Sequence, residues 1–156
     1  MGININQPVP GNIPLPGPAF FKKGPAMECS CTITVDDIGG AWKVSEEKNR
    51  TARKPHKCTE CGREIQPGER YEDFRGFCDE SDRWMRYKTC VDCLSLRVAF
   101  FDTYYFEFLW ENWWDEMDAC GWSVPESCLA KLTPVARARA CQSIENVWEQ
   151  WEDDDD

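Results

Sequence analysis

Apolar residues recur at helical spacing through the C-terminal half of the chain. Between Asp92 and about Met117 they fall on one face of a 3.6-residue repeat, which predicts a single long helix. Nine aromatic residues lie between Phe100 and Trp114, more than one helix face can hide. Either other helices cover this one, or an aromatic surface is left for a partner. The predicted face consists of Leu94, Val98, Phe101, Tyr105 and Phe108, with Asn112 at its polar end.

Two further helices are predicted after it. Residues 123–126 form a capping-box sequence with proline in the first turn, and this predicts a short helix to about Leu132. Thr133 and Pro134 begin the next helix. The apolar face of that last helix is expected to contain Val135, Ala138, Cys141, Ile144, Val147 and either Trp148 or Trp151.

The N-terminal half is patterned for short strands. Residues 29–35 alternate and are rich in β-branched residues, which predicts a short strand. Residues 70–75 and 83–88 predict a hairpin joined by the loop 76–82. Residues 45–57 are polar and basic, and we expect a loop there. The first 26 residues hold six prolines, which predicts a disordered or polyproline-like arm.

Two Cys-x-x-Cys pairs supply the clearest chemistry. Cys58 and Cys61 form the first pair, and Cys90 and Cys93 form the second after 28 intervening residues. Four thiolates at this spacing are the ligand set of a closed, tetrahedral structural zinc site. Such a site leaves no open position for water or substrate, so it predicts a structural metal.

These patterns together predict an α+β fold with a treble-clef-like arrangement. A zinc knuckle and β-hairpin lead into the long aromatic helix, whose first turn supplies the last two ligands, and two C-terminal helices pack on it. The expected organisation is a Pro-rich arm at 1–28, a zinc-binding hairpin module at 29–93, a helical region at 94–152 and an acidic tail at 153–156.

Six cysteines lie outside the main motif. They could be small buried hydrophobes, they could belong to a secreted disulfide framework, or four of them could close a second zinc site. Cys78 is a substitute ligand for that site, and Cys141 fits the core face of the last helix. The candidate second site consists of Cys29, Cys31, Cys120 and Cys128.

Charge divides the chain unevenly and bears on location and partners. Residues 50–97 carry eleven Lys and Arg against nine Asp and Glu, whereas residues 98–156 carry three against fourteen. The N-terminus lacks a signal-peptide pattern and no long apolar run exists, so we expect a cytoplasmic protein with no membrane span. An acidic half repels nucleic acid unless it is folded away from the binding face.

The sequence lacks the motifs of the common catalytic sites. His56 is the single histidine, and it could replace a metal ligand, touch phosphate or be an ordinary loop residue. No histidine lies between Cys61 and Cys90, where treble-clef nucleases place one, and no zinc-deaminase motif, phosphate loop or nucleophile elbow is present. We therefore expect a protein that is not an enzyme.

The same motifs resemble those of a group of small phage and prophage zinc-binding proteins. The shared features are Ala-Arg-Lys-Pro-His at 52–56, Cys-x-x-Cys-Gly at 58–62, Pro-Gly-Glu at 67–69 and Thr-Cys-x-x-Cys at 89–93. Members also carry an upstream Cys-x-Cys, matched by Cys29 and Cys31. This chain lacks the histidine that such proteins often carry near the later cysteines. The resemblance implies a phage origin, a host bacterial cytoplasm and a zinc fold.

Two functions follow as expectations. The first is a phage-encoded structural-zinc protein that binds another macromolecule, most simply a host or defence-system protein, with an acidic surface that mimics nucleic acid. The alternative is a nucleic-acid-binding zinc module that uses the Arg/Lys cluster at residues 50–75. Its candidate contacts are Arg53, Lys54, Lys57 and Arg63.

Overall fold

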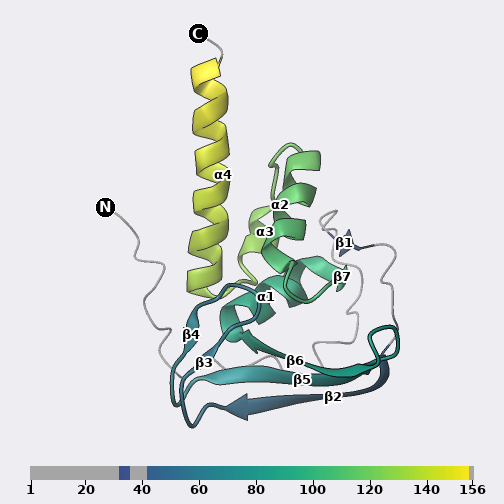
Figure 1. Ribbon diagram of the computed structural model, residues 1–156. Coiled ribbons are helices and arrows are strands. Elements are labelled where there is room, and N and C mark those ends of the chain that lie inside the picture. Colours follow the sequence, from purple (N-terminus) through teal and green to yellow (C-terminus); the bar gives the residue numbers. More distant parts are fainter. Residues whose placement is uncertain (1–31, 36–41, 155–156) are drawn as a thin grey trace.

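The protein is a mixed α+β structure with a sheet at one end and its helices on one side of that sheet (Figure 1). The computed structural model describes residues 32–35 and 42–154. Its described residues form four helices and several short strands, which confirms the predicted α+β class. The treble-clef arrangement stays a prediction.

A three-stranded antiparallel sheet forms the base of the structure. Its order is β2-β5-β6, with β2 at Trp42–Thr51, β5 at Arg70–Cys78 and β6 at Arg83–Cys90. The β5–β6 hairpin was predicted and is confirmed, with strands longer than expected. The loop predicted over residues 45–57 is wrong, because most of it is β2. Nearly all of that strand is exposed, so backbone pairing with β5, and not burial, holds it in place.

The knuckle lies between the sheet and the first helix. Short strands β3 (His56–Lys57) and β4 (Glu64–Ile65) pair around a turn in which Gly62 adopts a φ of 75°. That left-handed backbone is accessible to glycine without a Cβ penalty. Helix α1 (Val91–Phe100) then begins directly after Cys90, as predicted.

The single long helix expected over residues 92–117 is wrong. Helix α1 ends at Phe100, and the chain continues as β7 (Phe101–Thr103), which pairs in parallel with β1 (Ile33–Thr34). Helix α2 (Leu109–Ala119) starts only later. The interruption lets Phe106 stack on Tyr87 of the sheet at a centroid distance of 4.2 Å, a contact that a continuous helix would not allow.

The core joins the helices to the knuckle. Trp113 and Trp122 are buried and meet edge to face, beside Phe100 and Leu109. Trp114 remains partly exposed, so the aromatic run is divided between the core and the surface.

The last two helices begin differently. Helix α3 (Glu126–Leu129) has Pro125 at its N-cap without a side-chain bond, so the predicted capping box does not form. Helix α4 (Pro134–Asp154) is capped as predicted, since Thr133 Oγ1 accepts a hydrogen bond from the Ala136 amide at 3.3 Å. Helix α4 is the longest element, and its C-terminal half extends beyond α2 and α3 (Figure 1).

Two further expectations concern the N-terminal arm and membrane crossing. The predicted Pro-rich arm at 1–28 lies outside the described residues. Within the described part of the chain, no helix combines the length and apolar character that crossing a membrane requires.

Candidate metal centre

Cys58, Cys61, Cys90 and Cys93 come together as one cluster between the knuckle and α1. Their sulfur atoms all lie within 4.8 Å of one another, and three of the four side chains are buried. Cys61 Sγ and Cys90 Sγ are 3.8 Å apart. A tetrahedral ion with bonds of about 2.3 Å to sulfur sets its ligands about 3.8 Å apart, so the spacing fits such a site. The cluster could therefore hold a metal ion.

The protonation of these thiols also favours a cation. Hydrogen bonds from the other three thiols lower the pKa of Cys58 far below its usual value. Cys90 and Cys93 donate hydrogen bonds to the Cys58 thiolate. These bonds, together with burial, raise the pKa of both thiols. The pKa of Cys61 is lowered as well, because its hydrogen bond with Cys58 raises the pKa but those with Cys90 and Cys93 outweigh this effect. Without a metal, ionisation of Cys90 and Cys93 is therefore opposed. A divalent cation supplies the positive charge that allows all four thiols to ionise.

Nearby donors point at the sulfur atoms. The Cys90 amide donates to Cys58 Sγ at 3.4 Å, and the indole Nε1 of Trp110 donates to Cys93 Sγ at 3.3 Å. The guanidinium of Arg139 lies 4.0 Å from the centroid of the Trp110 ring. These contacts stabilise negative sulfur and connect the cluster to α2 and α4.

Arg63 links the knuckle to the start of α1. Its guanidinium contacts Glu69 at 3.1 Å and Asp92 at 3.0 Å, and it is largely buried. Asp92 also accepts a hydrogen bond from Thr133 Oγ1 at 2.7 Å. The base of α4 is therefore tied to the same polar network that surrounds the cysteines.

Glu60 completes the connection between the knuckle and α2. Its carboxylate accepts a hydrogen bond from the Leu109 amide at 3.3 Å, at the first turn of that helix. Burial raises the pKa of Glu60 to about 7, despite this bond.

The candidate second zinc site is not assembled by the described residues. Among these residues, the four-cysteine cluster is the one group of potential ligands close enough to share an ion. Cys120 is exposed, while Cys128 is buried and disulfide-bonded. Cys29 and Cys31 lie outside the described residues, so the second site stays a prediction. Cys78 and Cys141 are half-buried free cysteines.

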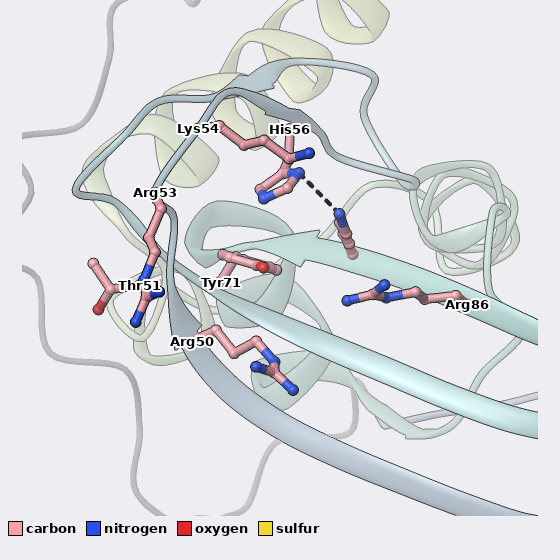
Figure 2. Close-up of a pocket in the computed structure, with 8 residues that line it drawn as sticks. Arg50, Thr51, Arg53, Lys54, His56, Tyr71 and Arg86 are labelled. Carbon is pink, nitrogen blue, oxygen red and sulfur yellow. Dashed lines mark hydrogen bonds between the residues drawn. The ribbon is translucent and has the colours of Figure 1, made fainter.

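A basic cavity opens beside the knuckle, on the outer side of the sheet (Figure 2). Its volume is about 950 Å³. Its lining includes five cationic side chains and, among the described residues, no carboxylate. In Figure 2, Lys54 and His56 lie on one side of the Tyr71 ring, and Arg50 and Arg86 lie on the other. The full lining is Arg50, Thr51, Arg53, Lys54, His56, Tyr71, Arg86 and Lys88.

The positive charges of the cavity act on one another. Lys88 Nζ lies 2.8 Å from His56 Nδ1, and desolvation followed by the charges of Lys88 and Lys54 lowers the pKa of His56. Desolvation and Arg86 lower the pKa of Lys88 in the same way. These directions indicate a positive potential that an anion would relieve.

Asp73 is the acid at the edge of this group. Its buried carboxylate accepts bonds from Arg86 at 2.7 Å and 2.6 Å and contacts Arg50 at 2.9 Å. The hydrogen bond from Arg86 lowers the pKa of Asp73, so it stays ionised and holds both arginines in position.

The predicted nucleic-acid contacts separate into two groups. Arg53 and Lys54 line the cavity, whereas Lys57 is exposed on β3 outside the lining and Arg63 is engaged beside the cysteines. Two further residues of the lining, Arg86 and Lys88, come from β6 and were not among the predicted contacts. These two residues lie two positions apart in a predicted strand, which places both side chains on one face of the sheet. That spacing could have indicated that they act together.

Comparison of the chain with protein-family models, with curated proteins and with solved structures found no match. The resemblance to phage zinc-binding proteins stays a prediction.

Proposed function

We propose that this protein is a structural-zinc module that binds nucleic acid through the outer face of its three-stranded sheet. The observation that carries the proposal is the convergence of five cationic side chains around one cavity in a chain whose net charge is −10. The five are Arg50, Arg53, Lys54, Arg86 and Lys88.

Zinc is the proposed metal because of its ligands. Four thiolates in tetrahedral spacing select zinc or an iron–sulfur centre over harder cations, and paired Cys-x-x-Cys motifs are typical of structural zinc. A closed shell of four sulfurs leaves no place for substrate, so the proposed role of the ion is structural and the protein is proposed not to be an enzyme. The ion would fix the knuckle, which in turn positions Lys54 and His56.

The charge arrangement supports a polyanion as the ligand. Asp73 neutralises part of the arginine charge, but the side chains toward the knuckle add Arg53, Lys54 and Lys88. Phosphate groups would form charge-assisted hydrogen bonds with these side chains and release counterions. No residue of α4 lines the cavity. The acidic residues of α4 therefore lie outside the proposed binding site, where their repulsion of a bound polyanion is weaker.

A salt-titrated binding assay tests this function. The zinc-loaded protein should bind a fluorescein-labelled oligonucleotide at about 50 mM salt, with a log–log salt slope of about −3 to −5 for five phosphate contacts. Lys54→Glu should weaken binding and reduce the slope, while Lys131→Glu on the helical side should not. Absence of binding at low salt would contradict the proposal.

A protein partner is the second candidate, favoured by the end of α4. Trp148 and Trp151 are 51% and 48% exposed there, next to the exposed acids Glu145, Glu149 and Glu152. Such a surface suits a basic, partly apolar partner, and an inhibitor of a host or defence protein that mimics nucleic acid is one form of it. If this candidate is correct, Trp148→Ala/Trp151→Ala should abolish capture of a host protein that Lys54→Glu still captures.

A further inference from the structure

The outer face of the sheet continues past the basic cavity to an exposed aromatic pair. Trp84 on β6 is 51% exposed and meets Phe77 of β5 edge to face at 5.7 Å. The guanidinium of Arg75 lies 4.5 Å from the centroid of the Trp84 ring. An exposed tryptophan with a cation on it, in a row with further cations, is not explained by the core or by the metal cluster.

Strand register places these groups in one row with the cavity. Phe77 pairs with Trp84, Arg75 with Arg86, and Asp73 with Lys88. Residues two apart in a strand share a face, so Trp84, Arg86 and Lys88 follow one another along the outer side of β6. From Trp84 to Lys88 the strand spans about 13 Å, roughly the rise of four stacked nucleotides in one strand.

The acids of this face are already paired. Glu46 contacts Lys48 at 2.6 Å, and Asp73 is held by Arg50 and Arg86. Its cations outnumber its acids, so the face as a whole is positively charged: the cations are Lys48, Arg50, Arg75, Arg86 and Lys88. A ligand that fits must therefore offer repeated negative charge together with a flat ring for Trp84.

We propose that the outer face binds single-stranded nucleic acid, with a base stacked on Trp84 and the phosphates running over Arg86 and Lys88 into the basic cavity. This inference rests on the proposed function and adds the strand state of the ligand. Duplex DNA hides the faces of its bases, whereas a single strand exposes them to an aromatic platform. Duplex binding would use the cations alone and leave Trp84 without a role.

The test compares single-stranded and duplex oligonucleotides of one sequence on the zinc-loaded protein. DNA and RNA single strands are measured separately, and the tighter of the two shows which sugar the face prefers. We expect at least one single strand to bind more tightly than the duplex. Trp84→Ala should weaken single-strand binding about 5- to 100-fold while leaving the salt slope unchanged, because stacking releases no counterions.

Two variants serve as controls. Trp84→Phe retains a stacking ring and should recover most of the affinity, and Trp148→Ala removes an equally exposed tryptophan from α4 and should change nothing. Thermal unfolding of each variant verifies that the fold is intact. Equal affinity of Trp84→Ala and wild type, or tighter binding of the duplex, would overturn the single-strand inference and leave the proposed function standing. Absence of binding to every oligonucleotide would instead contradict the proposed function itself.

Discussion

The metal-centred region, from β2 to the end of α1 (residues 42–100), and the C-terminal region after it (residues 101–154) are built on different principles. In the first, buried charges hold the structure: Arg97 pairs with Glu72, and the two side chains are 3% and 1% exposed. In the second, apolar packing dominates, with Trp113 and Trp122 both buried. The first presents a cationic face to solvent, whereas residues 98–156 carry a net charge of −11. A chain that is acidic overall can thus keep a basic surface when the acids fold onto separate elements.

The two regions nevertheless share a boundary at the cysteine cluster. Trp110 of α2 donates to Cys93, and Thr133 at the start of α4 donates to Asp92. Loss of the metal should therefore disturb the first region directly and the second through these contacts.

Metal removal should produce the largest effect. Stripping the zinc with a chelator, or replacing Cys90 by Ser, should abolish the cooperative unfolding of the metal-centred region, because structural zinc contributes on the order of 10 kcal/mol to folding. Circular dichroism during heating, together with metal analysis by mass spectrometry, measures this. We expect one zinc per chain.

The matched control is Cys141→Ala, in a half-buried position on α4 away from the cluster. It should retain one zinc and an almost unchanged unfolding temperature. An apoprotein as stable as the zinc-loaded form would refute a structural role for the metal. Two zinc ions per chain would instead support the second site at Cys29, Cys31, Cys120 and Cys128, in a form of the protein in which Cys128 is not disulfide-bonded.

A smaller loss should follow from breaking the buried ion pair. Arg97→Met removes the partner of Glu72 and should lower the free energy of unfolding by about 3–5 kcal/mol, since an unpaired buried carboxylate is left. The double variant Arg97→Met/Glu72→Leu should recover much of the loss. Urea unfolding of the zinc-loaded proteins gives both values. A cost below about 1 kcal/mol for Arg97→Met would show that the region does not depend on its buried charges.

The smallest effect concerns pH. The pKa of His56 is lowered, so His56 is neutral at pH 7 and accepts a bond from Lys88. The lowered pKa means that His56 binds a proton more tightly in the unfolded chain than in the folded protein. Neutral His56 therefore contributes to stability above pH 6.5. This contribution decreases as the pH falls toward the pKa that His56 has in the folded protein. Bound phosphate has the opposite effect, since it favours protonated His56.

Oligonucleotide affinity should therefore rise as the pH falls below 6.5, by less than about tenfold. His56→Gln should remove this increment and keep the affinity measured at pH 8. Anisotropy titrations across this pH range provide the measurement. A wild-type profile matching that of His56→Gln would mean that His56 does not sense the ligand.

Local sequence signals predicted the features that depend on neighbouring residues. The paired Cys-x-x-Cys motifs, the β5–β6 hairpin and the Thr133 cap all follow from short-range chemistry and are present. The features that the sequence did not predict depend on contacts between residues far apart in the chain. The aromatic run has helical periodicity throughout, yet the helix is interrupted after Phe100 and Phe106 stacks on Tyr87 of the sheet.

The binding face was only partly predictable for the same reason. Arg53 and Lys54 stand out in the sequence as a basic cluster. Arg86 and Lys88 come close to them only because β2 pairs with β5 and β5 pairs with β6. Strand β2 was missed because its exposed, polar residues carry no alternation, although its pairing with β5 places Arg50 beside Tyr71.

Nuclear magnetic resonance mapping of the binding surface tests the central claim most directly. Zinc-loaded, ¹⁵N-labelled protein would be titrated with a single-stranded oligonucleotide while backbone amide shifts are followed. The account predicts perturbed amides along β2, β5 and β6, including Trp84 and Lys88, and unchanged amides in the C-terminal half of α4. Perturbation confined to α4, or no perturbation at low salt, would contradict the assignment of binding to the sheet.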